Sequence, residues 1–97
     1  MRLIDEIGEP ALLELVAEEC VELAHAALKL ARVERGENPT PRTREGCRRK
    51  VEEEWADVMI TLSELAEASW TDPKIYQEFY DEKQKRMEER ISDVYRV

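Results

Sequence analysis

Apolar side chains recur every three or four positions along most of the chain, which is the spacing of one face of an α-helix. The first of these runs begins at Pro10, because a residue without an N–H fits the first helical turn, and it continues to about Arg35. Gly36 ends it, and the segment 37–43 holds two prolines. We therefore expect one long helix followed by a loop.

Two further helices are predicted after this loop. The second covers residues 43–69. Thr71 and Asp72 have side chains suited to capping a helix, and Pro73 follows at the first helical position. A third helix is therefore expected to begin there and to reach roughly Asp93.

The composition favours an all-α fold. Glycine is scarce, with three residues in 97, and Ala, Leu, Glu, Lys and Arg dominate the helical runs. A chain of this length forms a single domain, residues 1–97, whose core is of marginal size. We expect a small helical bundle that is completed by oligomerisation, as a homodimer or homotetramer.

The net charge is −8, from 15 Lys and Arg against 23 Asp and Glu. This charge disfavours binding to nucleic acid or to an anionic membrane surface, and no apolar stretch approaches the ~20 residues that span a bilayer. Cys20 and Cys47 are too few for a disulfide framework, and the opening MRLIDEIGEP has no basic segment followed by an apolar run. We expect a cytoplasmic protein with neither a nucleic-acid nor a membrane partner.

The first predicted helix carries acids at the edge of its apolar face. At ~100° per residue, this core face consists of Leu12, Leu13, Val16, Cys20, Leu23, Ala24, Ala27, Leu30 and Ala31. Glu19 and Glu22, three residues apart, lie on the shoulder of the face. Other polar side chains are expected to point away, namely Glu14, Glu18, His25 and Lys29.

The second predicted helix repeats this arrangement. Its core face consists of Cys47, Val51, Trp55, Val58, Met59, Leu62, Leu65 and Ala66. Glu54 and Asp57 occupy the shoulder with Thr61, whereas Glu52 and Glu53 face elsewhere. If the two helices pack antiparallel, both acidic shoulders meet along one groove.

Four carboxylates in one groove, those of Glu19, Glu22, Glu54 and Asp57, repel one another and call for a cation. Oxygen ligands without histidine or thiolate favour Mg²⁺, or Mn²⁺, over zinc, and Mg²⁺ commonly combines carboxylates with substrate phosphates. Either acidic pair alone is more typical of a solvated helix face, but both pairs on core shoulders favour a metal site. A di-iron site normally uses Glu-x-x-His pairs, and the single histidine, His25, lies on the wrong face.

The segments EECVEL (18–23) and EEWADV (53–58) resemble the EExxEL and EExxDV signatures of MazG-like all-α nucleoside triphosphate pyrophosphatases. The resemblance covers roughly residues 4–67, although the stretch 23–53 is on the long side for the family. The ExxE motif of the family corresponds to Glu19 and Glu22 in this sequence, and its ExxD motif corresponds to Glu54 and Asp57. These are the four residues that the helical faces select.

The resemblance implies an enzyme that cleaves nucleoside triphosphates between the α- and β-phosphates and yields the monophosphate and pyrophosphate. The metal would neutralise phosphate oxygens and lower the pKa of the attacking water. A metal ligand, or Glu18 or Glu53 beside the ligands, would accept the proton of this water. The sequence does not choose among them.

The third predicted helix has basic residues within its apolar face. This face consists of Tyr76, Phe79, Tyr80, Met87, Ile91 and Val94. Lys83 lies near its middle and Arg86 on its shoulder. Lys83 either extends its stem along the core or, with the help of Arg86, neutralises triphosphate oxygens, as the resemblance implies for downstream basic residues. Lys50, one turn before Glu54, is expected to be the ion-pair partner of that glutamate.

Two other interpretations stay open. A non-catalytic helical interaction module would offer its apolar faces to a partner and would not respond to metal. A relative that acts on another phosphorylated metabolite, such as phosphoribosyl-ATP, would not release pyrophosphate from ordinary deoxynucleoside triphosphates. Trp55 and Trp70 are expected in the core or at an interface, and Cys20 is expected to be buried.

Overall fold

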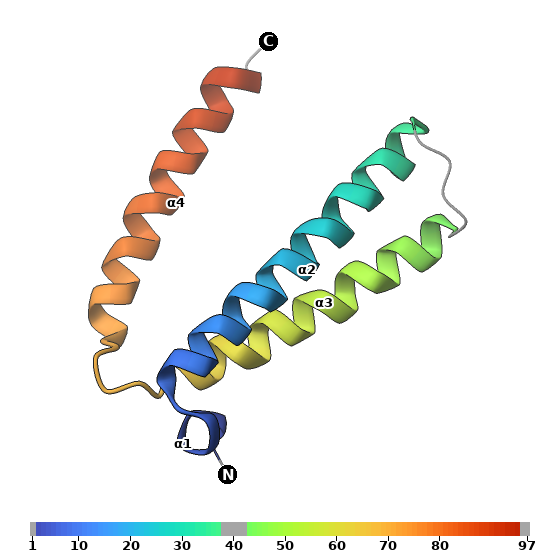
Figure 1. The fold of residues 1–97 in the computed structure, drawn as a ribbon. Coiled ribbons are helices and arrows are strands. Elements are labelled where there is room, and N and C mark those ends of the chain that lie inside the picture. The colour runs from blue at the N-terminus through green and yellow to red at the C-terminus, as the bar shows by residue number, and fades with distance from the viewer. Residues whose placement is uncertain (1, 38–42, 96–97) are drawn as a thin grey trace.

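The computed structural model describes residues 2–37 and 43–95, and within these ranges the chain is all-α, without a β-strand (Figure 1). A short helix, α1 (Leu3–Ile7), precedes two long helices, α2 (Glu9–Arg35) and α3 (Arg44–Leu65). Helix α4 (Pro73–Tyr95) follows. The predicted all-α fold is confirmed, and α1 lies in a segment for which the apolar pattern predicts no helix.

Local caps set the helix boundaries. Gly36 ends α2 in the left-handed conformation (φ 68°), which glycine adopts without a steric penalty. At the start of α3, the side-chain oxygen of Thr43 accepts the N–H of Gly46 at 3.0 Å. Before α4, Oδ1 of Asp72 accepts the N–H of Lys74 at 2.9 Å. Each of these caps is visible in the sequence.

Helix α3 ends earlier than predicted, at Leu65 instead of Ser69. The hydroxyl of Thr71 donates to the carbonyl oxygens of Ala66 and Ala68, at 2.7 and 2.8 Å. Carbonyl groups after the end of the helix thereby find a donor, and the chain turns toward α4. Of the predicted loop, positions 38–42 lie outside the described residues.

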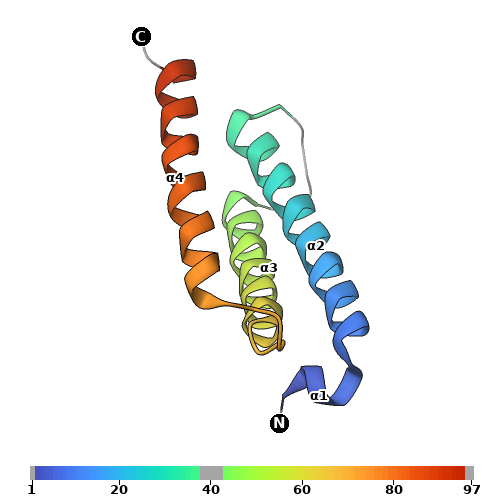
Figure 2. The ribbon, with the colours of Figure 1, turned by 90° about the vertical axis from the view of Figure 1, so that its left-hand side faces the viewer.

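Helices α2 and α3 run antiparallel and pack side by side (Figures 1 and 2). We call the stripe along which they meet the seam. On α2 it consists of Leu12, Val16, Glu19, Leu23, Ala26 and Leu30, and on α3 of Cys47, Val51, Glu54, Val58, Thr61 and Leu65, all buried or half-buried. These positions alternate spacings of four and three residues, as in a coiled coil. The seam therefore includes two acids among apolar residues.

The seam corrects the predicted core faces. Cys20 is exposed rather than buried, and Trp55 and Met59 are 59% and 53% exposed. Seven residues of α2 and α3 that are predicted to be in the core are exposed, and each of them directly follows a seam residue in the sequence. We call this exposed stripe the apolar flank; it consists of Leu13, Cys20, Ala24, Ala27, Trp55, Met59 and Leu62. The predicted faces are too wide because they include the apolar stripe next to the seam, whereas two paired helices cover only one stripe of each.

We call the antiparallel pair of α2 and α3 the hairpin. Helix α1 precedes the hairpin in the sequence and the turn before α4 follows it, but both contact the same end of the hairpin. The N–H of Leu3 donates to Oε2 of Glu64 at 2.9 Å. The indole N–H of Trp70 donates to Oε1 of Glu9 at 2.7 Å, while the Trp70 ring remains 59% exposed. These bonds connect residues 61 positions apart and fix the lower end of the hairpin in Figure 1.

Helix α4 stands apart from the hairpin (Figure 1). Among the described residues its backbone packs against none of the other three helices, and only Ser92 is less than exposed. Its predicted apolar face is therefore uncovered within one chain; Tyr76 and Val94, for example, are 64% and 67% exposed. No helix in the described ranges combines the length and the apolar character needed to cross a bilayer.

Candidate metal centre

Three carboxylates meet where α2 and α3 pack against each other. Glu19 comes from α2, and Glu54 and Asp57 come from consecutive turns of α3. One oxygen of each carboxylate lies within 4.8 Å of the other two. Glu54 is 5% exposed, and the other two are half-buried. Because Glu19 and Glu54 occupy seam positions, the pairing of the helices itself brings the group together.

The carboxylate group raises the pKa of Glu19. Desolvation of the side chain is the largest cause, and the negative charges of Asp57, Glu54, Glu22 and Glu18 add to it in that order. Both effects favour the protonated form. A cation placed among these oxygens would act in the opposite direction and stabilise the ionised carboxylate.

Lys50 already brings one positive charge to the group. Its Nζ lies 2.8 Å from Oε1 of Glu54 and 3.6 Å from Oε1 of Glu53. The hydrogen bond to Glu54, followed by the charges of Glu53 and Glu54, raises the pKa of Lys50. The predicted ion pair between Lys50 and Glu54 is confirmed.

The donor set fits Mg²⁺ or Mn²⁺. Mg²⁺ binds oxygen at about 2.1 Å in octahedral geometry, so that oxygens on opposite sides of one ion are about 4.2 Å apart. The three carboxylates each offer one oxygen within 4.8 Å of the other two, a spacing at which they could hold one such ion. The group contains neither imidazole nor thiolate, which zinc usually prefers.

Comparisons with protein families, with curated proteins and with solved structures find no match. The interpretation of this site rests on its geometry and on the two acidic motifs.

A hollow of about 190 Å³ adjoins the carboxylates on the side of the loop that joins α2 to α3. It is lined by Glu22, His25, Ala26, Lys29, Cys47 and Lys50. Glu22 is exposed here and does not belong to the group of three oxygens. The structure thus brings together three of the four expected ligands, and the metal-binding role of all four stays a prediction.

His25 and Lys29 face this hollow, although the helical wheel places them away from the core. Their position follows once the seam is known, because positions 22, 25 and 29 each precede a seam position by one residue. They form one side of the hairpin with the acids of both motifs. We call this side the charged flank, which comprises Glu18, Glu22, His25, Lys29, Lys50, Glu53 and Asp57.

Glu18 and Glu53, the candidate proton acceptors outside the predicted ligand set, lie beside the predicted metal ligands. Glu18 precedes Glu19 on α2 and is exposed. Glu53 precedes Glu54 on α3, is exposed, and is paired with Lys50. Glu52 faces away as expected, with Oε1 2.9 Å from Arg49.

Lys83 and Arg86 lie on α4 and are exposed. Arg86 pairs with Glu82 at 2.7 Å, one turn away on the same helix. Within the described part of a single chain, α4 does not pack against the hairpin that carries the carboxylates. The substrate-binding and catalytic roles of these residues therefore stay predictions.

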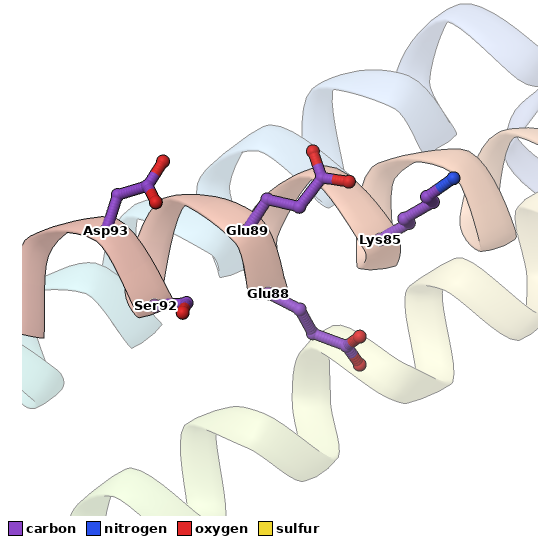
Figure 3. A pocket seen from close by; sticks show the side chains of 5 residues that line it. All are labelled: Lys85, Glu88, Glu89, Ser92 and Asp93. Atoms are coloured by element: carbon purple, nitrogen blue, oxygen red, sulfur yellow. The ribbon is translucent and has the colours of Figure 1, made fainter. Parts of the chain in front are cut away.

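A second hollow, of about 500 Å³, runs along α4 (Figure 3). Figure 3 shows its lining, which consists of Lys85, Glu88, Glu89, Ser92 and Asp93. All five residues belong to one helix, and three of them are acids, so this open surface is poorly suited to an anionic ligand. At ~100° per residue it is the polar side of α4, opposite to the apolar face.

Proposed function

We propose that this chain is a Mg²⁺-dependent nucleoside triphosphate pyrophosphohydrolase of the MazG-like type. The observation that carries the proposal is the meeting of Glu19, Glu54 and Asp57 in and beside the hairpin seam, with oxygens within 4.8 Å. The spacing of the ExxE and ExxD motifs selects the same residues. Motif and packing support a site that binds a divalent cation and, through it, a polyphosphate.

In this proposal the three carboxylates hold the metal, and Glu22 adds a fourth from the next turn of α2. Bound Mg²⁺ supplies charge neutralisation at the phosphate oxygens and a more acidic attacking water. Glu18 and Glu53 stand next to ligands on the charged flank and are the proposed acceptors of the water's proton. Cleavage between the α- and β-phosphates then yields the nucleoside monophosphate and pyrophosphate.

We further propose that the protein acts as a homodimer or homotetramer. Each residue of the apolar flank follows a seam residue and therefore lies about 100° further around its helix. Because α2 and α3 are antiparallel, this rotation brings the flank residues of both helices to the same side of the hairpin. The charged flank lies on the other side. A second copy packed on the apolar flank covers Trp55 and Met59, which are more than half exposed in one chain, and leaves the carboxylates accessible.

Helix α4 fits this assembly. Its apolar face lacks a partner in its own chain, and Lys83 lies within that face. We propose that α4 packs at a subunit boundary, where Lys83 and Arg86 meet the triphosphate. This arrangement would explain why basic residues occupy an otherwise apolar stripe.

The exposed apolar side chains also favour one second candidate, a non-catalytic interaction module. A single assay separates it from the enzyme. The purified protein is incubated with each common nucleoside and deoxynucleoside triphosphate in the presence of Mg²⁺, and pyrophosphate is measured. The proposal expects Mg²⁺-dependent release of pyrophosphate, without orthophosphate, from at least one of them. Release from phosphoribosyl-ATP alone would identify the other enzyme class, and no release from any would favour the module.

A further inference from the structure

Lys50 stands between two parts of the candidate site, the carboxylate group and the hollow. On one side its Nζ is 2.8 Å from Oε1 of Glu54, a carboxylate that is nearly fully buried. On the other side it lines the hollow next to Lys29 and His25. The Lys50 side chain is 37% exposed, so it has room to move.

We propose that Lys50 alternates between these two parts: it neutralises Glu54 while the carboxylates hold no cation, and it binds phosphate oxygens in the hollow once they do. The hollow would then receive the pyrophosphate portion of the substrate. This inference rests on the proposed function and extends it to a phosphate subsite and its gating residue.

Competition for Glu54 is the physical basis of the exchange. A divalent cation and the Lys50 ammonium both interact with the same buried carboxylate, and a divalent cation that also binds Glu19 and Asp57 has the stronger attraction. Two cations this close repel each other. Lys50 therefore leaves Glu54 when the cation arrives, and it already lines the hollow, which can receive its ammonium group.

The hollow is suited to an anion once the carboxylates are loaded. Glu22 is its single acid, and as the proposed fourth metal ligand it turns toward the cation. Lys29, Lys50 and the imidazole of His25 then remain around the space. Lys29 forms no ion pair with another described residue, so its charge is available. In a chain of net charge −8, two lysines thus lie beside the carboxylate site.

The test compares Lys50→Met with the wild type and with Arg49→Met in the full chain. Methionine keeps the length of the stem and removes the charge. Arg49 is the matched control, because it also forms ion pairs within α3, with Glu45 and Glu52, but faces away from the hollow. Calorimetry measures the binding of Mn²⁺ alone and, separately, of inorganic pyrophosphate at saturating Mg²⁺; circular dichroism checks that each variant is folded.

We expect opposite shifts in the two affinities of Lys50→Met. Mn²⁺ should bind about three- to tenfold more tightly, because its competitor is gone, and pyrophosphate about tenfold more weakly. Lys50→Arg should restore pyrophosphate affinity, and Arg49→Met should change neither value. A purely structural ion pair would alter the melting temperature and leave both affinities alone.

Unchanged or weaker Mn²⁺ binding, or unchanged pyrophosphate binding, in Lys50→Met would overturn the inference. If the wild type still released pyrophosphate from a nucleotide, the proposed function would survive that result. If the wild type bound neither Mn²⁺ nor pyrophosphate, the proposed function would fail and this inference with it.

Discussion

Glu19 occupies a seam position of α2, where the four-three spacing of its neighbours Val16 and Leu23 would ordinarily place an apolar residue. Burial and the surrounding carboxylates raise its pKa. Glu54 has the same kind of position on α3 but is compensated by Lys50 at 2.8 Å. An uncompensated acid in the seam costs folding stability, so packing alone does not account for Glu19 at this position.

We predict that Glu19→Gln stabilises the metal-free protein at neutral pH. A carboxyl group whose pKa is higher in the folded than in the unfolded state contributes most to stability below its unfolded pKa, near 4.5, and loses that contribution as pH rises through the folded value. The gain in melting temperature from the amide should therefore be absent at about pH 4 and grow toward neutral pH. Thermal unfolding at several pH values measures it.

Mg²⁺ provides the control for this prediction. The cation should raise the melting temperature of the wild type and affect Glu19→Gln much less, because an amide is a poor ligand. If metal-free Glu19→Gln were less stable than the metal-free wild type at neutral pH, the claim that the neighbouring carboxylates repel Glu19 would be contradicted. For Glu54→Gln no such gain is expected, since the substitution also breaks the ion pair with Lys50.

At this scale the sequence predicts which acids come together better than it predicts which side chains are buried. The motifs identify Glu19, Glu54 and Asp57, and helical spacing identifies the partner of Glu54. A helical wheel predicts neither the exposure of Cys20 nor the contribution of His25 to the hollow. It shows which side chains share a face of one helix, but not which stripe of that face the other helix covers.

At the scale of the elements, the hairpin and α4 differ in how they are held. The caps at Gly36, Thr43 and Asp72 are local, and the sequence therefore predicts the helix starts and ends within a few residues. The early end of α3 depends on Thr71, which bonds back to carbonyls after the helix. The placement of α4 away from the hairpin follows from no local signal, because its apolar face predicts packing without specifying a partner.

For α4 we predict that Lys83→Met lowers kcat/KM for the nucleotide on the order of 10–100-fold while the melting temperature stays unchanged. Methionine keeps the apolar contact of the stem and removes only the charge that would meet the triphosphate. Steady-state kinetics with circular dichroism measures both effects.

Lys85→Met is the matched control for this substitution, since Lys85 lies on the polar side of the same helix (Figure 3). It should retain full activity. If Lys83→Met kept full turnover, or lost it only through unfolding, the lysine would be structural and would have no role in substrate binding.

At the scale of the whole molecule, a 97-residue chain leaves two apolar surfaces uncovered, the apolar flank of the hairpin and one face of α4. Large exposed side chains include Trp55 at 59% and Phe79 at 56%. Patches of this kind on a small chain mark interaction surfaces. The sequence predicts that the core is too small to stand alone, but which residues remain uncovered becomes visible only once the seam is known.

We predict a dimer or tetramer by light scattering at micromolar concentration. A charged residue in the apolar flank should weaken this assembly, because the isologous contact of two copies would bury it twice. Met59→Lys is suitable, since Met59 is exposed in the single chain and the substitution leaves the seam intact. A monomeric wild type would refute the predicted assembly.

The central claim, that the seam carboxylates bind a divalent cation needed for nucleotide cleavage, is tested most directly by Mg²⁺-dependent pyrophosphate release from Asp57→Asn. Asp57 belongs to the group within 4.8 Å and forms no ion pair with a described residue, so its amide removes a ligand without breaking another contact. Glu52→Gln is the control, because Glu52 faces away and pairs with Arg49. The account predicts a loss of about a hundredfold or more for Asp57→Asn and nearly full activity for Glu52→Gln. Full Mg²⁺-dependent release from Asp57→Asn would contradict it.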